Sequence, residues 1–330
     1  MCIRDRYKFD MKKVAVIGAG PSGITAIKNF KDQGFEVTAF ERCSGVGGNW
    51  RYNDPSGHSS VFETTHIISS KYTSYYEDFP LPKNASDYPS HKELLQYFQA
   101  YTDHFDLNKN IKFKTEVMHC SQNTEHKWKV KWKDLNENRV IDDEFDALVV
   151  CNGHHHEPRH PNYPGKFSGE YLHSHQYKKA APFADKKVLV IGGGNSACDV
   201  AVETARISKK TALSWRRGYY LIPKFMFGLT SDIFALKARW IPRFLRLPFM
   251  KFMLELIQGK NEDIGLPKVT NHILATHPTV NSDLYNAVRH GKVKPKCDIE
   301  RFDGKTVYFQ DGTHEKFDAV IACTGYKIKH

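Results

Sequence analysis

The chain has 330 residues, of which 40% are apolar and 26% carry charge. This composition excludes a disordered chain, and the length suits two intertwined domains better than one small core. The net charge of +11 would attract nucleic acid or an anionic membrane surface, but the sequence holds no nucleic-acid-binding motif, so we expect no nucleic-acid partner.

The predicted compartment follows from features that the sequence lacks. It contains no run of about 18 apolar residues that would predict a membrane-spanning helix. Its start lacks the apolar core and cleavage site of a signal peptide. The seven cysteines are an odd number without a C-x-x-C pair, which argues against a disulfide framework. We therefore expect a cytoplasmic protein. Residues 1–10 are expected to be a non-native or disordered leader.

The first strand and turn predict a dinucleotide site. A strand over 13–17 leads into a glycine turn, 18–23, and a helix from about 22 to 33, so backbone N–H groups of the turn can approach a pyrophosphate. The next strand, 35–40, ends at Glu41, 23 residues after Gly18, where an acid can accept hydrogen bonds from ribose hydroxyls. This unit suits FAD or NAD.

A small antiparallel meander follows a second glycine-rich turn at 45–50. Apolar and polar residues alternate over 111–120, 127–133 and 139–141, and 144–151 resembles a return strand into the main sheet.

Three prolines between 154 and 164 indicate a crossing between domains. The adjacent residues His154, His155 and His156 lie at its start. Consecutive side chains on extended backbone point in different directions, so we predict no metal site there.

The second glycine turn predicts a different dinucleotide. It begins at Gly192, after a strand-like run from Lys187, and leads into a helix. The residue 23 positions after Gly192 is Trp215 rather than an acid, and Arg216 and Arg217 follow it. A guanidinium pairs well with a 2′-phosphate, so the site suits NADPH. The alternative is that the two arginines form a solvated basic turn.

Residues 219–270 interleave aromatic and basic side chains. Between 216 and 260 there are nine Lys or Arg against Asp232 and Glu255, and prolines are expected to break any long helix. The segment either packs its aromatics into a small core of its own or forms a lid or a membrane-touching surface.

The C-terminal part repeats the plan of the first unit. Asp303-Gly304 and Asp311-Gly312 predict turns, the first of them in a hairpin, and 318–326 repeats the return strand. The predicted fold is α/β, with two Rossmann-like dinucleotide-binding domains, the NADPH domain being inserted into an FAD domain that carries the meander. The predicted boundaries are 11–165 for the first part of the FAD domain, 166–290 for the NADPH domain with an insertion at about 219–270, and 291–330 for an incomplete return to the FAD domain.

The segment between the two glycine turns fits the pattern F-x-G-x-x-x-H-x-x-x-Y, its fixed positions being Phe167, Gly169, His173 and Tyr177. This pattern is a family fingerprint, and on it the chain resembles the flavin-containing monooxygenases, the class B flavoprotein monooxygenases, over 11–330. Shorter motifs that support the resemblance lie at 47–50, 194–199, 277–280 and 322–326. The fingerprint ends in Tyr177 followed by Lys178, rather than in Trp followed by Pro or Asp. This ending is more similar to that of the heteroatom-oxidising branch than to that of the Baeyer–Villiger branch.

The resemblance implies FAD and NADPH as cofactors. NADPH would reduce FAD, and O2 would then form a C4a-hydroperoxide that oxygenates a nucleophilic nitrogen or sulfur, as in an N,N-dimethylaniline monooxygenase. The residues that would hold FAD are Gly18, Ala19, Gly20, Pro21, Ser22, Gly23, Glu41, Arg42, Gly48, Asn49, Trp50 and Ser69. Those that would hold NADPH are Gly192, Gly194, Asn195, Ser196, Ala197, Cys198, Asp199, Arg216 and Arg217.

No catalytic dyad is expected, because the protein would mainly exclude water and proton donors from the flavin. His173 and His175 would be contacts of the domain linker rather than acid–base catalysts. Asp199 either complements a helix N-terminus or contacts the nicotinamide dinucleotide, and the two roles are compatible.

One position departs from the family pattern. Ile68, beside Ser69, stands where many members place an asparagine next to the flavin. Ser69, Ser70 or Thr65 substitutes for that amide, or the protein stabilises its intermediate poorly and releases hydrogen peroxide, or its substrate scope differs.

We therefore expect an FAD- and NADPH-dependent monooxygenase that uses O2 to oxidise a small-molecule amine or sulfide. A Baeyer–Villiger monooxygenase and a non-catalytic flavin- and NADPH-binding redox sensor stay open as alternatives. A homodimer and peripheral membrane contact also stay open. We expect the chain to be a C-terminally truncated fragment, because members of this family continue well beyond the turn at 324–325.

Overall fold

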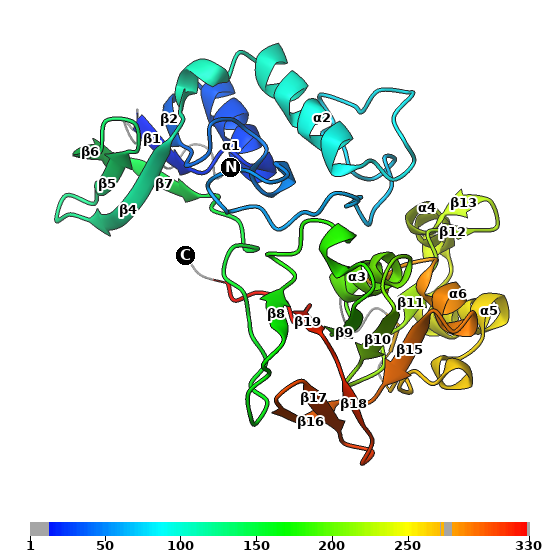
Figure 1. The fold of residues 1–330 in the computed structure, drawn as a ribbon. Helices are drawn as coiled ribbons and strands as arrows, with labels where there is room; N and C mark the ends of the chain where they lie inside the picture. Colours follow the sequence, from blue (N-terminus) through cyan, green and yellow to red (C-terminus); the bar gives the residue numbers. More distant parts are fainter. Residues whose placement is uncertain (1–12, 271, 274–278, 329–330) are drawn as a thin grey trace. The chain divides into compact units, whose positions relative to one another are not determined.

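The computed structural model describes residues 13–270, 272–273 and 279–328 (Figure 1). They divide into two compact units: the first takes 13–61, 90–156 and 328, and the second takes the described residues of 62–89 and 157–327. The predicted leader, 1–10, and His277 and Pro278 of the motif at 277–280 lie outside the described residues.

The first unit is built on a parallel sheet. Its strand order is β3-β2-β1-β7, with β1 Lys13–Ile17, β2 Glu36–Phe40, β3 Ile111–Lys112 and β7 Ala147–Val150. The central residues of β1 are fully buried, as in a sheet covered on both faces. The helices are α1 Pro21–Asp32 and α2 His91–His104, with short 3-10 turns η2 Gly48–Trp50 and η3 Asn108–Asn110.

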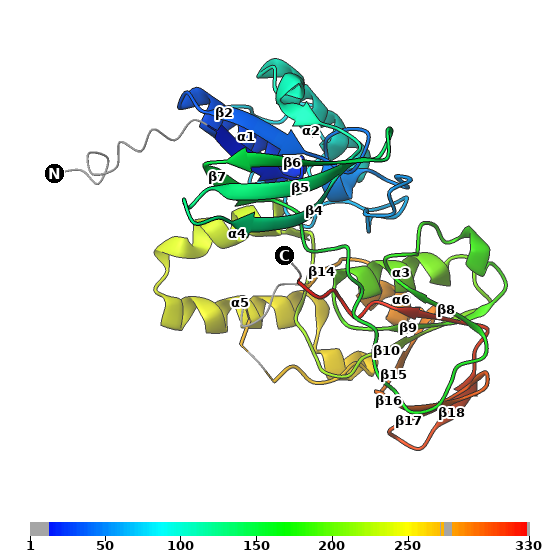
Figure 2. The ribbon, with the colours of Figure 1, turned by 90° about the vertical axis from the view of Figure 1, so that its left-hand side faces the viewer.

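An antiparallel meander covers part of this sheet. Its strands are β4 Thr115–Gln122, β5 Trp128–Asp134 and β6 Arg139–Phe145 (Figure 2). The ring of Phe40 lies 5.6 Å from that of Trp132 and 5.8 Å from that of Phe145, so aromatic contacts join the meander to β2. The predicted meander is confirmed, but 111–120 is not one strand, because Lys114 takes a φ of 51° and turns the chain between β3 and β4.

The second unit repeats the parallel plan. Its strand order is β15-β10-β9-β19-β8, with β8 Glu170–His173, β9 Lys187–Ile191, β10 Lys210–Ser214, β15 Val293–Lys296 and β19 Ala319–Ala322. Helices α3 Asn195–Ala205 and α6 Leu284–Arg289 pack against these strands and each other. A second meander has the strands β16 Ile299–Asp303, β17 Thr306–Phe309 and β18 His314–Lys316. Gly304 and Gly312 take φ values of 56° and 78°, which confirms both predicted turns.

The segment 219–270 holds mostly short elements, together with one long helix. They are β11 Leu221–Ile222, β12 Phe225–Met226, β13 Leu229–Thr230, α4 Ser231–Lys237, η5 Ala238–Trp240, α5 Arg243–Gln258 and η6 Asn261–Ile264; β14 Thr279–Val280 pairs with β11, and η4 Ala181–Phe183 precedes β9. The expectation that prolines break any long helix was wrong, since α5 runs through Pro248. Among the described residues, no helix is both long and apolar enough to cross a bilayer.

The structure divides the chain differently from the predicted boundaries. β19 lies between β9 and β8, so residues 291–327 belong to the second unit rather than returning to the first sheet. Residues 62–89 also join the second unit, where Glu63 N donates to Lys178 O at 2.8 Å and Ser70 N donates to Asp232 Oδ2 at 2.7 Å. A short, fully buried apolar strand such as β19 suits any parallel sheet, so its sequence does not select one.

Candidate functional site

The first glycine turn brings three backbone segments into close contact. A Cβ on Gly18, whose φ is 93°, would lie 2.6 Å from Cys151 O, and a Cβ on Gly23 would lie 2.0 Å from Gly18 O. Only glycine fits at these two positions. α1 then begins after Gly20, with Pro21 at its first position and no side-chain cap. The N–H groups of its first turn are therefore suited to donate hydrogen bonds to an anion.

The second glycine-rich segment packs against the first turn. Gly47 N donates to Ala19 O at 3.1 Å, and a Cβ on Gly48 would lie 3.0 Å from Gly20 Cα. The structure therefore brings the two predicted FAD-binding segments, 18–23 and 48–50, together in one unit.

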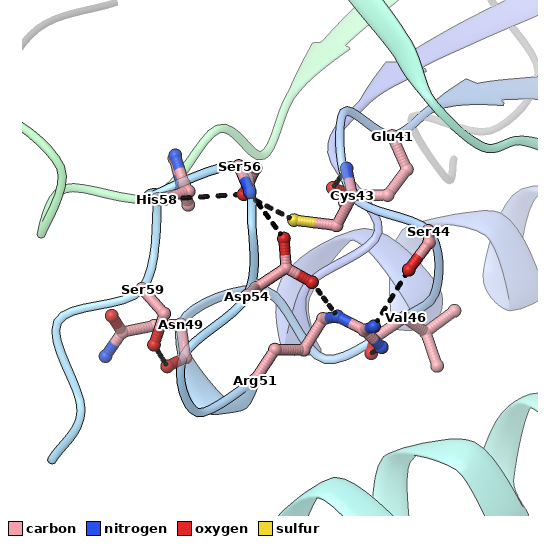
Figure 3. Close-up of polar contacts among 10 residues, drawn as sticks. All are labelled: Glu41, Cys43, Ser44, Val46, Asn49, Arg51, Asp54, Ser56, His58 and Ser59. Atoms are coloured by element: carbon pink, nitrogen blue, oxygen red, sulfur yellow. Dashed lines mark hydrogen bonds and ion pairs between the residues drawn. The ribbon is translucent and has the colours of Figure 1, made fainter. Parts of the chain in front are cut away.

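Glu41 ties the end of β2 to the glycine turn. Its side chain is buried, and Oε2 accepts from Ala19 N at 2.7 Å while Oε1 accepts from Cys43 N at 2.7 Å (Figure 3). A carboxylate has about four lone-pair sites, so each oxygen keeps capacity for one further donor such as a ribose hydroxyl. The predicted position of Glu41 beside the turn is confirmed.

An ion pair that the sequence analysis missed fastens the loop after Glu41. Arg51 Nε donates to Asp54 Oδ2 at 2.8 Å, and the same guanidinium reaches Ser44 Oγ at 3.1 Å and Val46 O at 3.3 Å (Figure 3). Burial raises the pKa of Asp54, but hydrogen bonds from Arg51 and Ser56 outweigh it and lower the pKa to about 2. The i, i+3 spacing of Arg51 and Asp54 was the one sequence signal for this pair.

Four other predicted FAD residues lie in varied surroundings. Asn49 Oδ1 accepts from Ser60 N and Ser60 Oγ, both at 2.8 Å, so this oxygen holds the loop that follows. Trp50 ends η2 and is half-buried. Arg42 is exposed and lies 3.7 Å from Glu116 on β4. Ser69 accepts from Ser74 Oγ at 2.7 Å in the second unit, so it is not part of the same unit as the glycine turn.

Ile68 is half-buried in the same segment of the second unit. Of the residues considered as substitutes for the missing asparagine, Thr65 Oγ1 accepts from Phe62 N at 2.9 Å and Ser70 is fully buried.

The second glycine turn has the same close backbone approach. Gly192 N donates to Ser214 O at 3.0 Å, and a Cβ on Gly192 would lie 2.4 Å from Cys323 O. Gly194 caps α3, and a Cβ there would meet no atom within 4 Å, so the end of this helix is open. Ser196 is exposed, whereas Ala197 and Cys198 are buried. Burial raises the pKa of the Cys198 thiol, which keeps it protonated.

Hydrogen bonds to β14 and the loop after it fix α3. Asn195 Oδ1 accepts from Val280 N at 2.7 Å, and Asp199 Oδ1 accepts from Asn281 Nδ2 at 2.7 Å. Asp199 lies in the second turn of α3, so the idea that it complements the helix N-terminus was wrong. Burial raises its pKa to about 6.

The residues after β10 differ sharply in exposure. Trp215 is 1% exposed, its ring lies against Gly193, and it stacks on Tyr219 with ring centroids 6.0 Å apart. Arg217 Nε donates to Tyr219 Oη at 2.8 Å, whereas Arg216 is simply exposed beside it. Of the two arginines, Arg216 is therefore the one whose guanidinium is less restricted by its own loop.

The fingerprint residues stabilise the second unit. The ring of Phe167 lies 5.8 Å from that of Phe302, and a Cβ on Gly169 would lie 2.6 Å from Asp318 O. His173 is fully buried, and burial lowers its pKa to about 4, so it stays neutral. Its Nδ1 accepts from His175 N at 3.1 Å.

The last fingerprint residue, Tyr177, is also buried. Its hydroxyl donates to Glu203 Oε2 at 2.8 Å on α3. Burial raises the pKa of Glu203 to about 7, and the charge on Asp199, one turn earlier, adds to the rise. The sequence analysis missed this half-buried carboxyl group because Glu203 stands alone in a helical pattern.

The three adjacent histidines do not converge. The rings of His154 and His155 lie 4.1 Å apart, while His156 stacks on His58 at 5.0 Å. Over the part of the chain that the structure describes, no group of three or more His, Cys, Asp or Glu is placed to hold a metal ion.

Comparison with known proteins identifies the family of the chain. Residues 11–330 match the family described as flavin-binding monooxygenase-like. The chain is 35% identical to flavin-containing monooxygenase 5 from Rattus norvegicus and 35% identical to dimethylaniline monooxygenase [N-oxide-forming] 2 from Oryctolagus cuniculus, each time over 96% of this chain and 62% of the relative. Among solved structures, S-allyl-L-cysteine S-oxygenase from Allium sativum superposes with a TM-score of 0.70 at 25% identity, covering 97% of this chain and 63% of that one.

Proposed function

We propose that this chain, which belongs to the flavin-binding monooxygenase-like family, holds FAD at its first glycine turn and NADPH at its second. The family uses FAD and NADPH. The chain spans about 62% of the length of the curated relatives named above, and the activity of the whole protein is part of this proposal.

The difference between the two turns carries the assignment. At the first turn, the Glu41 carboxylate stands at the end of β2 with lone pairs left for ribose hydroxyls, and it would repel a 2′-phosphate. At the second, Trp215 replaces the acid and exposed Arg216 follows, which suits a 2′-phosphate. Neither α1 nor α3 has a side-chain cap at its N-terminus, so the N–H groups of both first turns would donate to a pyrophosphate.

The proposed reaction is oxygenation of a nucleophilic nitrogen or sulfur in a small molecule. Bound FAD, reduced by NADPH, would supply the oxygen-transfer chemistry. The residues of this chain would bind and orient the cofactors. The names of the relatives support both substrate atoms, since one forms N-oxides and another is an S-oxygenase.

Three measurements test the proposal. Flavin absorbance retained by the purified 330-residue chain, and NADPH binding by isothermal calorimetry with NADH as the comparison, test the two sites. Oxidation of NADPH with dimethylaniline, a dialkyl sulfide or cyclohexanone, measured with any in-frame continuation of the coding sequence included, tests the reaction.

The products separate the alternatives. An N-oxide or sulfoxide supports the proposal, and an ester from the ketone as the sole product would replace it with a Baeyer–Villiger activity. Tight flavin binding without NADPH oxidation would instead indicate a non-catalytic protein.

A further inference from the structure

Trp215 and Glu41 stand at the same place in the two units. Each lies 23 residues after the first glycine of its turn and directly follows a parallel strand, β10 or β2. Glu41 N donates to Lys112 O at 2.9 Å, and Trp215 N donates to Lys296 O at 3.1 Å, so each backbone is held by the next strand of its sheet. Where the acid of a dinucleotide-binding unit meets ribose hydroxyls, the second unit therefore has an indole.

The two side chains meet their glycine turns in opposite ways. In the first unit, Glu41 Oε2 accepts from Ala19 N at 2.7 Å. In the second, Gly193 takes the place of Ala19, and a Cβ on it would lie 1.4 Å from Trp215 Nε1. The other two nearest ring atoms, at 2.2 and 2.3 Å, are the carbons bonded to this nitrogen, so the nitrogen is the part of the indole that faces the turn. An indole has a donor and no acceptor, so the second turn gains a donor where the first has a carboxylate.

The indole N–H of Trp215 finds no acceptor among the residues that the structure describes. The side chain is 1% exposed, so this donor is buried. Buried donors are nearly always hydrogen-bonded, and one without a partner destabilises a fold. Trp132, the buried indole of the first unit, follows the usual rule, since its Nε1 donates to Asp143 Oδ2 at 2.8 Å. An unpartnered donor that faces a glycine turn points to an acceptor carried by a ligand.

The surroundings of Trp215 favour an anionic acceptor. Arg216 follows it and is exposed. The ring of Tyr219 stacks on the indole with centroids 6.0 Å apart, and Tyr219 Oη accepts from Arg217 Nε at 2.8 Å. The indole N–H and two guanidinium groups therefore belong to one short loop. Hydrogen bonds to a phosphate are stronger than those to a neutral hydroxyl, so these donors favour a phosphate over a ribose hydroxyl.

We propose that Trp215 is a specificity-determining residue, whose indole N–H donates to an oxygen of the 2′-phosphate on the adenosine ribose of the dinucleotide, beside Arg216. This inference rests on the proposed NADPH site and deepens it, because it assigns the contact to a buried tryptophan. A side chain at position 193 would separate the indole from the ligand, so Gly193 and Trp215 are required together.

The indole N–H signal of Trp215 tests the proposal. The chain has five tryptophans, so protein labelled with 15N at the indole nitrogen should give five indole signals in a 1H–15N spectrum. A hydrogen bond to a phosphate moves an indole proton downfield. We expect NADP+ and 2′,5′-ADP to move the Trp215 signal downfield, and NAD+ and 5′-AMP to move it less. Trp132, whose donor already has a partner, is the internal control and should keep its signal in place.

Matched variants give a second measurement. Trp215→Phe keeps a ring beside Tyr219 and removes the donor. Calorimetric titration should show a Kd for NADP+ raised at least about tenfold, because a hydrogen bond to a charged group is lost, and an unchanged Kd for NAD+. Trp132→Phe makes the same change at a buried indole of the first unit and should bind both dinucleotides like the parent chain.

The titration of the parent chain does not depend on the folding of Trp215→Phe. Where that variant folds, the signal that it lacks is the Trp215 signal. Where it does not, single replacements of the other four tryptophans by Phe assign the Trp215 signal by elimination.

Three results would overturn the proposal and leave the NADPH site in place. The first is calorimetric binding of NADP+ without a shift of the Trp215 signal. The second is an equal shift with NAD+, which would assign the contact to the pyrophosphate. The third is an unchanged Kd for NADP+ in folded Trp215→Phe. Absence of NADP+ binding by the parent chain would instead contradict the proposed function, and this inference with it.

Discussion

The indole of Trp215 occupies the space that a side chain at Gly193 would need. A Cβ on Gly193 would lie 1.4 Å from Trp215 Nε1, so the middle residue of the second glycine turn is small because the residue at the end of β10 is large. This pair links the second glycine turn to the core of the second unit, which contains Trp215.

We expect Gly193→Ala to destabilise the chain by about 1–3 kcal/mol, because it overpacks a buried site. Trp215→Leu should cost stability by leaving a cavity, and the double variant should cost less than the sum of the two single variants. Urea unfolding of all four proteins measures the coupling. Additive effects would show that the two residues do not share this space.

Glu41→Gln should loosen the first glycine turn. An amide places an NH2 group opposite one of the two backbone N–H donors that the carboxylate accepts from, so the variant should lose about 1–3 kcal/mol of stability and most of its bound flavin. Flavin absorbance after gel filtration and urea unfolding measure the two effects. The matched control is Glu36→Gln, the same change at an exposed residue of the preceding strand, which should retain flavin. Equal flavin content in both variants would contradict the role of Glu41.

The half-buried carboxyl group of Glu203 predicts a pH dependence of stability. Its folded pKa, about 7, lies above the ordinary value, so the folded state binds this proton more tightly than the unfolded state. The stability that this tighter proton binding contributes is fully present below about pH 4 and is lost as the pH rises through about 7.

The free energy of unfolding of Glu203→Gln minus that of the parent should therefore be larger at pH 8 than at pH 5. We expect the increase to be at least about 1 kcal/mol, once the partial exposure of Glu203 is allowed for. Tyr177 can still donate to the amide oxygen, so packing is preserved. Urea unfolding at the two pH values measures the difference. A pH-independent gap between variant and parent would show that Glu203 does not titrate in this range.

Arg216 should determine the preference for NADPH over NADH. Removing a charge-assisted hydrogen bond to a 2′-phosphate costs about 1.5–3 kcal/mol, so Arg216→Ala should raise the Kd for NADPH at least about tenfold and leave the Kd for NADH unchanged. Calorimetric titration gives both constants. Lys209→Ala, at an exposed basic residue just before β10, is the control for a general loss of positive charge. A parallel loss of NADH affinity in Arg216→Ala would indicate a structural effect instead.

The parts of the fold that could be predicted are those that depend on neighbouring residues in the chain. The glycine turns, the strands before them and the turns at Gly304 and Gly312 follow from local backbone geometry and the alternation of apolar residues. The helix through Pro248 was missed because tertiary packing of Met250 and Leu254 outweighs the local cost of the proline.

The candidate sites were predicted less completely. Glu41 could be placed because its distance from Gly18 along the chain sets its position at the end of β2. Arg51 with Asp54 has only a weak spacing signal, and Tyr177 with Glu203 has none, because these partners meet through loop and helix packing.

By itself, the sequence determined two α/β units with unlike dinucleotide turns, since strand–turn–helix chemistry is local. Only the tertiary structure decided that β19 and residues 62–89 join the second unit, that Trp215 fills the space over Gly193, and that Phe249 and Phe252 of α5 stay exposed. The physical reason is that an apolar strand or helix face predicts burial but not the surface that it packs against. That surface depends on contacts between residues far apart in the chain.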